Sequence, residues 1–233
     1  MQYQCKKDYK MIKRTLTTLT LGLLLSGCAS NTNPTLHNSG FLDDYSSLKQ
    51  SPYDTGTHLY IAEDVDLSSY EYVMVKPVKI MANNEQIKAK RGLLKEMSEY
   101  MTQKVRTKIS KNPNYTLVTK PQPNTLKVEF ALTAVSVAYS EREVYEYIPV
   151  ALVITEASRA SGLSKKDARV LVELRVSDAN TGKILGRAIS SQKGEKVTLK
   201  EDELTLEVLK PALDRYAQRI NERLDQVKKN NKK

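Results

Sequence analysis

The sequence predicts an α+β fold, a two-layer sandwich in which two long helices cover a mostly antiparallel sheet of four or five strands. Segments 85–111 and 203–228 carry apolar residues at every third or fourth position, which is typical of amphipathic helices. Shorter segments before and between them alternate apolar with polar residues, as strands with one buried face do. Helices gathered on one face of such a sheet bury both apolar surfaces.

Two strands are expected before the first helix. Residues 58–61 form a short run with apolar side chains, and residues 70–80 are rich in β-branched and aromatic side chains. Pro77 has no backbone N–H to donate to a neighbouring strand, so we expect it at a sheet edge or a strand end.

The first helix is predicted from one apolar stripe at four-residue spacing. Leu94 joins this stripe, whose regular members are Leu93, Met97, Met101, Val105 and Ile109. Asn112-Pro113-Asn114 ends the helix, and a short strand is expected at 115–118.

A long strand is predicted over residues 125–139. The even-numbered residues from Leu126 to Ala134 are apolar, whereas Lys127, Glu129 and Thr133 lie between them. One face of the strand is therefore expected to be buried and the other more polar, as in an antiparallel sheet covered by helices.

The last third of the chain predicts a hairpin and a second helix. Val170, Val172, Leu174 and Val176 alternate with polar residues, the turn 178–182 contains Asn and Gly, and a strand follows over 183–191. The apolar stripe of the final helix consists of Leu206, Leu209, Leu213, Tyr216, Ile220, Leu224 and Val227. Pro211 either kinks this helix or marks its first turn.

The N-terminal stretch predicts an export signal. Basic residues precede an apolar-leaning run at 16–25, and small residues follow it, which is the order found in secretory signal peptides. Ten residues span only about 15 Å as a helix, against a bilayer core of about 30 Å, so a permanent transmembrane helix is not expected. Met1 and Met11 both remain candidate starts.

Leu25-Ser26-Gly27-Cys28 ends this run and is similar to the lipobox of bacterial lipoproteins. The resemblance implies cleavage between Gly27 and Cys28, a lipid on the Cys28 sulfur, and acylation of the new amino group with a chain such as palmitate. Three acyl chains form a stable anchor. Ala29 stands where Asp favours inner-membrane retention in this class, which implies the outer membrane and a protein that faces the periplasm.

These assignments divide the chain into four parts. Residues 1–27 are the signal peptide, and residues 28–50 are a lipidated tether with a docking segment, because 29–38 are mostly Ser, Asn, Thr and Pro. Residues 51–228 are expected to form a single periplasmic α+β domain. Residues 229–233 are expected to be a basic, frayed tail.

The docking segment has one apolar face if it is helical, formed by Phe41, Leu42, Tyr45 and Leu48. Gly-Phe-Leu-x-Asp-Tyr-Ser-x-Leu soon after a lipidated cysteine resembles a family of bacterial lipoproteins of unknown function, and the order of the downstream elements agrees. The resemblance implies no activity. Two interpretations of Phe41, Asp44 and Tyr45 are open: a segment that seals one edge of the core, which we favour, and a partner-binding strip.

Charge and cysteine content narrow the class of partner. The precursor has a net charge of +10; five basic residues and Asp8 precede Cys28, which leaves 32 basic and 26 acidic residues, a net charge of +6. Removal of Cys5 and lipidation of Cys28 leave no thiol for a disulfide within the mature chain. For an exported protein, basic charge favours anionic lipid or polysaccharide over nucleic acid, although an ordinary solvated surface is the simpler interpretation.

The sequence contains no recognisable catalytic or metal-binding motif. It has two histidines and none of the HExxH, CxxC, GxSxG or glycine-rich phosphate-loop patterns, so no enzyme activity, metal or cofactor is predicted. It has 13 tyrosines against two phenylalanines. Tyr145 and Tyr147 flank a charged stretch and are candidate partner contacts, with half-buried sheet residues as the alternative.

We therefore expect a non-enzymatic docking or assembly accessory, anchored in the membrane through the lipid on Cys28 and in contact with an envelope protein. The alternative is a binding module for peptidoglycan or anionic glycolipid, which the basic charge favours.

Overall fold

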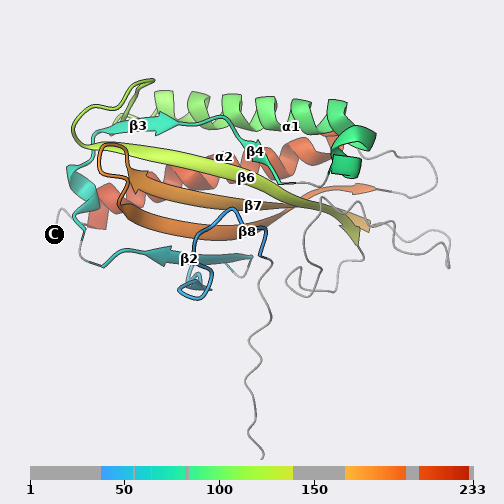
Figure 1. The fold of residues 1–233 in the computed structure, drawn as a ribbon, viewed down its shortest axis with the longest axis horizontal. Helices are drawn as coiled ribbons and strands as arrows, with labels where there is room; N and C mark the ends of the chain where they lie inside the picture. The colour runs from blue at the N-terminus through green and yellow to red at the C-terminus, as the bar shows by residue number, and fades with distance from the viewer. Residues whose placement is uncertain are drawn as a thin grey trace, which may run out of the picture. The chain divides into compact units, whose positions relative to one another are not determined.

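The structure, a computed structural model, describes residues 38–54, 56–63, 65–81, 84–138, 166–197 and 205–230 (Figure 1). The signal region, Gly27, Cys28, Tyr145 and Tyr147 lie outside these ranges, so their predicted roles remain predictions. Residues Pro34–Lys233 form one compact unit. The elements in the described ranges are, in chain order, β1 (Lys49–Gln50), β2 (Thr57–Ile61), the 3-10 helix η1 (Leu67–Ser69), β3 (Tyr72–Val75), β4 (Lys79–Ile80), α1 (Asn84–Ser110), β5 (Thr116–Leu117), β6 (Thr125–Ala138), β7 (Lys166–Asp178), β8 (Ile184–Val197) and α2 (Leu206–Asn230).

All these strands join one mixed sheet of eight strands. Its order is β1-β2-β8-β7-β6-β3-β5, and β4 pairs with β6 beyond the end of β3. The neighbours from β1 to β6 in this order are antiparallel, whereas β3 and β4 pair parallel with β6, and β5 pairs parallel with β3. The predicted α+β class is confirmed, but the prediction of four or five mostly antiparallel strands is wrong. A strand of two residues is too short to show an alternating pattern. The parallel pairs depend on a crossover connection through α1, which local sequence patterns do not reveal.

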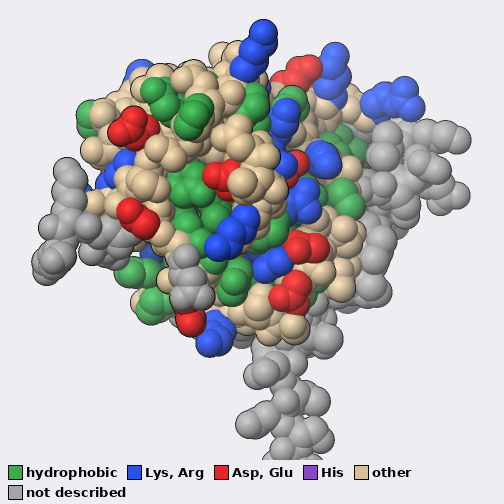
Figure 2. Space-filling view, turned by 60° about the vertical axis from the view of Figure 1, so that its left-hand side comes forward, with side chains coloured by type: hydrophobic (Ala, Val, Ile, Leu, Met, Phe, Trp, Pro, Cys, Tyr) green, Lys and Arg blue, Asp and Glu red, His purple; other side chains and the backbone are tan. Residues whose placement is uncertain are grey.

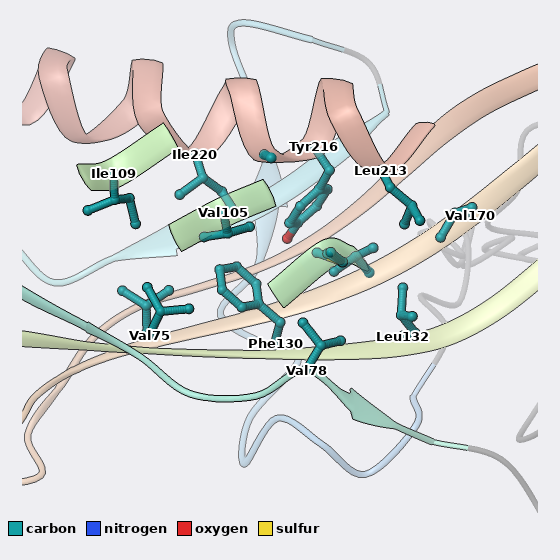
Figure 3. Close-up of a cluster of buried hydrophobic side chains, with 14 of the residues drawn as sticks. Val75, Val78, Val105, Ile109, Phe130, Leu132, Val170, Leu213, Tyr216 and Ile220 are labelled. Carbon is teal, nitrogen blue, oxygen red and sulfur yellow. The ribbon is translucent and has the colours of Figure 1, made fainter. Parts of the chain in front are cut away.

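Both helices bury their apolar stripes on the same face of the sheet. Met97, Met101 and Val105 of α1 are fully buried, as are Leu209 and Leu213 of α2. Figure 3 shows helix and strand side chains meeting in this core, where the rings of Phe130 and Tyr216 lie edge to face with their centres 6.0 Å apart. The predicted stripes therefore do form the core, although Leu93 lies at its margin and Leu94 is the more buried of the two.

A β-bulge reverses the faces of β6 after Leu132. The register with β7 shifts between Leu132 and Ala134, and Thr133 is the extra residue. Val135 consequently joins the main core, and Ala134 packs on the opposite face of the sheet. The prediction that Ala134 shares a face with Leu132 is wrong, because one inserted residue inverts every later side chain.

The prolines and the hairpin turn also have defined positions. Pro77 lies between β3 and β4, so the predicted strand over 70–80 is broken there. Pro211 lies in the second turn of α2 rather than its first. The predicted hairpin is present as β7 and β8: Asp178 accepts hydrogen bonds from the Asn180 and Thr181 backbone, and Gly182 has a φ of 75°, which glycine adopts readily. The helix α2 continues through the first residues of the predicted tail, to Asn230.

The sheet is wider than its helical layer. Seven strands lie abreast, and at about 4.8 Å per neighbour they span about 29 Å. Two packed helices cover only about 20 Å. The helix α2 lies mainly on β8 and β7, and α1 lies beside α2 on the β3 side. The face of β2 that points toward the helices therefore lies near the edge of the area that the helices cover.

We predict that Phe130→Ala lowers the free energy of unfolding by about 3–5 kcal/mol, because it leaves a cavity between both helices and the sheet. Urea denaturation followed by circular dichroism measures the change. Gln103→Ala, at an exposed position of α1, is the control and should change stability by less than about 0.5 kcal/mol. Equal effects of the two substitutions would contradict the assigned core.

Candidate functional site

The docking segment lies on the sheet face opposite the helices. Phe41, Leu42 and Leu48 are buried there against Ala131, Leu171 and Ile189. The segment forms irregular turns rather than a helix, and it covers part of a face of the sheet, whereas the sequence placed it at an edge of the core. Phe41 is only 6% exposed, so its side chain belongs to the domain's own packing.

Polar contacts fix this segment to the sheet. The Tyr45 hydroxyl donates to Glu173 Oε2 at 2.7 Å and accepts from the backbone N–H groups of Gly40 and Leu42. Glu173 is fully buried, and burial raises the pKa of Tyr45. A buried carboxylate requires such charge-assisted donors. Tyr45 therefore attaches the segment to β7 and does not serve as an outward-facing contact.

Cations surround the same segment. Arg187 forms two contacts with Asp43, of 2.9 and 2.6 Å, and Arg175 donates to the Phe41 carbonyl at 3.3 Å. The Phe41 ring lies near the cationic groups of Lys79 and Arg175, 5.8 and 5.1 Å from its centre. Asp44 instead caps its own turn, where hydrogen bonds from the hydroxyl and the backbone N–H of Ser46 lower the pKa of Asp44 to about 2. Of the predicted contact residues, Phe41 and Tyr45 lie together and hold the segment in place.

A cavity of about 220 Å³ lies between α2 and the sheet. Its walls come from η1, β2, β6, β7, β8 and α2, and they are mainly apolar: Leu59, Leu126, Val128, Leu174, Val176, Leu185, Ile220, Leu224 and Val227. It opens to solvent where Tyr53 and Ile61 line it, because these side chains are 61% and 51% exposed. Figure 2 shows hydrophobic side chains in a hollow, with charged side chains around it.

Three small residues on β8 explain why this space exists. Gly186, Ala188 and Ser190 line the cavity at alternate positions of the strand. They pair with Ile61, Leu59 and Thr57 of β2. Small side chains here cannot fill the gap beneath α2, and β2 lies at the margin of the helical cover. Leu174 and Val176 consequently remain only half-buried.

Charged groups form one rim of the cavity. Asp54 Oδ2 lies 3.1 Å from Arg219 and 3.9 Å from Arg223. The guanidinium of Arg223 lies over the Tyr53 ring, 3.9 Å from its centre, and also donates to Ser51 at 3.3 Å. The two arginines occur at i and i+4 on α2, so they share one face of the helix. An apolar interior with a cationic rim suits an amphiphilic ligand.

The loop that carries Tyr53 and Asp54 is held by the strands beside it. The side-chain amide of Gln50 donates to the carbonyls of Asp54 and Thr57. Gly56 passes so close to β8 that a Cβ there would lie 2.9 Å from the Ser191 carbonyl oxygen. Glycine is therefore required for this approach, which places Asp54 at the cavity rim.

Among the residues that the structure describes, no group of three or more His, Cys, Asp or Glu side chains is placed to hold a metal ion. The described ranges contain no helix with the length and hydropathy that a membrane span requires. Neither observation identifies a catalytic arrangement, and the cavity remains the main candidate site.

The cavity was not predicted from the sequence. Two signals for it were present: the small residues at alternate positions of 186–190, and Arg219 and Arg223 four residues apart. Neither signal is specific, because the cavity depends on which strand lies beneath α2.

Comparison with known proteins identifies the family. A family model described as a protein of unknown function, DUF3313, matches residues 37–220. The chain belongs to this family. It is also 28% identical over 200 residues to the uncharacterized lipoprotein YdcL of Escherichia coli K12, a match that covers 84% of this chain and 88% of YdcL. YdcL of Escherichia coli O157:H7 matches equally. These findings support membership of an uncharacterised lipoprotein family, as the sequence indicated.

Two solved structures show distant likeness to this DUF3313 chain. The hypothetical protein CT253 of Chlamydia trachomatis is 10% identical with a TM-score of 0.40, covering 66% of this chain and 98% of that one. The PelC dodecamer of Paraburkholderia phytofirmans is 8% identical with a TM-score of 0.35, covering 68% and 94%. Likeness at this level says nothing about function.

We predict that Tyr45→Phe lowers the free energy of unfolding by about 1–3 kcal/mol, because it removes a donor from the buried Glu173 carboxylate. Urea denaturation measures the change. Tyr53→Phe removes the same hydroxyl from an exposed ring and should have almost no effect. If Tyr45→Phe leaves the free energy of unfolding unchanged, Tyr45 does not stabilise the attachment of the segment to β7.

The Asp43–Arg187 pair predicts a dependence of stability on pH. The hydrogen bond from Arg187 lowers the pKa of Asp43 below its ordinary value of 3.8. The stabilisation is therefore present above pH 3.8 and is lost as the pH falls through the lower, folded-state pKa. Melting temperatures measured from pH 7 down to about pH 2 should show wild type above Asp43→Asn at neutral pH, with the difference closing in acid. A difference that grows in acid would contradict this pairing.

Proposed function

We propose that the protein is a lipid-anchored, non-enzymatic lipoprotein of the outer membrane that faces the periplasm and binds an amphiphilic envelope molecule in the cavity beneath α2. This proposal develops the glycolipid alternative from the sequence. The observation that carries it is the apolar cavity of about 220 Å³ with Arg219 and Arg223 at its rim.

The hydrophobic effect supplies the affinity in this proposal. An engineered apolar cavity of about 150 Å³ stays dry and binds benzene, so a larger opening lined by Leu, Val and Ile can accept an apolar group. Each CH₂ that leaves water contributes about 0.8 kcal/mol. Because the cavity is already formed, little of this free energy is spent on opening the protein.

A short tether keeps the cavity near its source of ligand. Phe41 is buried on the sheet, and the predicted tether before it consists of residues 29–38. With the predicted lipid on Cys28, these residues reach at most about 35 Å. The domain would therefore sample the membrane surface and the adjacent aqueous layer.

Docking on an envelope protein is a second candidate function. It is favoured by Tyr53 and Ile61, the large hydrophobic side chains most exposed among the described residues. Exposed aromatic and aliphatic groups are common in protein interfaces. The two functions separate experimentally, because filling the cavity should abolish ligand binding while leaving Tyr53 available to a partner protein.

We predict that Ala188→Phe weakens binding of the neutral apolar dye N-phenyl-1-naphthylamine, measured by its fluorescence increase. The phenyl ring should occupy the cavity, so affinity should fall at least about tenfold while the melting temperature stays equal or rises. Thr119→Phe adds the same ring at an exposed position and should leave dye binding unchanged. Dye affinity that is unchanged in Ala188→Phe, or absence of dye binding in wild type, would contradict the proposed function.

A further inference from the structure

We infer that the ligand of this cavity is a monomeric lipid with one acyl chain and an anionic head group, and that the head group replaces Asp54 as the counter-ion of Arg219 and Arg223. The inference rests on the proposed function and names the ligand class of the same site. It depends on the size of the cavity, the state of Asp54 and the position of the mouth.

The size of the cavity selects one chain. Sites that enclose a whole drug-sized ligand have volumes of about 300–1,000 Å³, and this cavity has about 220 Å³. It therefore holds part of a ligand, with the remainder at the mouth. A lipid with two chains would leave its second chain against the polar rim and water. A single chain, by contrast, can enter between Ile61 and α2 and leave the rest of the molecule, with its head group, at the mouth.

Asp54 is an incompletely satisfied partner for the two arginines. Its Oδ2 faces both guanidinium groups, but the distance to Arg223 is 3.9 Å. Its Oδ1 is buried, and no donor among the described residues lies within hydrogen-bond distance of it. A buried acceptor without a donor costs free energy. Asp54 thus neutralises the rim when the site holds no anion, at a cost that an incoming anion relieves.

The arginines have donors to spare for a head group. Each guanidinium carries five N–H donors in a planar fork that matches carboxylate and phosphate oxygens. Arg219 and Arg223 are 41% and 33% exposed, so an anion approaching from solvent reaches them. With two arginines and one aspartate, the rim has a net positive charge, which favours an anionic head group over a neutral or cationic one.

Tyr53 lies at the entrance of the cavity, beside the site where the head group replaces Asp54. Its ring lies on Arg223 and also lines the cavity. Asp54 is the next residue, so the counter-ion that the head group replaces lies beside the entrance of the chain.

The test is a displacement titration on the chain of residues 34–233. This chain contains every residue of both cores, and a cooperative thermal transition, measured before the titration, is the check that it folds. Bound N-phenyl-1-naphthylamine is displaced with dodecyl phosphate or with dodecyl maltoside, both below their micellar concentrations. We expect dodecyl phosphate to displace the dye at a concentration about tenfold lower than dodecyl maltoside does. This preference corresponds to the free energy of at least one charged hydrogen bond. It should decrease in high salt, which screens the charges.

Variants then assign the preference to the rim. The double substitution Arg219→Gln and Arg223→Gln should abolish the preference for dodecyl phosphate. The double substitution Arg91→Gln and Arg215→Gln makes the same change in net charge at exposed positions and should preserve it. Asp54→Asn should strengthen binding of dodecyl phosphate several-fold and leave dodecyl maltoside unchanged, because only the anion competes with the carboxylate.

The outcomes distinguish the inference from the proposed function. Equal displacement by both amphiphiles, or weaker binding of dodecyl phosphate by Asp54→Asn, would overturn the anionic assignment while leaving an apolar site intact. Absence of dye binding in wild type would overturn both. Co-sedimentation with phosphatidylglycerol vesicles that is stronger than dodecyl phosphate binding, and unaffected by Ala188→Phe, would show adsorption to a two-chain bilayer and overturn the capture of a single chain.

Discussion

The width of the β-sheet is the constraint on which the rest of the structure depends. Seven strands abreast expose two broad apolar faces, and two helices cover only part of one of them. The chain meets this constraint differently on each side. On one face, α1 and α2 bury a continuous core around Phe130. On the other, the irregular segment that follows the predicted tether covers Ala131, Leu171 and Ile189.

Each face of the sheet has one feature that matters for function. On the helix side, small residues on β8 and the marginal position of β2 leave an opening beneath α2 that the protein's own side chains do not fill. On the opposite side, Tyr45 and Asp43 attach the N-terminal segment to Glu173 and Arg187. The predicted membrane anchor is therefore connected to a fixed point on the domain, and the cavity is on the other face of the same strands.

Local sequence patterns recovered the parts of the fold that local physics determines. The stripes of both helices and the alternation of β7 depend on periodicity, and the hairpin turn depends on Asp178 and Gly182. The mixed sheet, the bulge at Thr133 and the break at Pro77 depend on pairing between distant segments. Glu173 illustrates the difference: it occupies the polar phase of its strand, yet it is buried because residues from another part of the chain cover it. The cavity is non-local for the same reason, since the small residues of β8 matter only beneath α2.

The proposed lipid site is tested most directly by a crystal structure of residues 34–233 with dodecyl phosphate. We expect the alkyl chain beneath α2, in contact with Leu59, Ala188 and Leu224, with the phosphate within hydrogen-bond distance of Arg219 and Arg223 and with Asp54 withdrawn from both. An alkyl chain bound elsewhere, or a cavity that stays closed to it while Asp54 keeps its place, would show that the site is assigned wrongly.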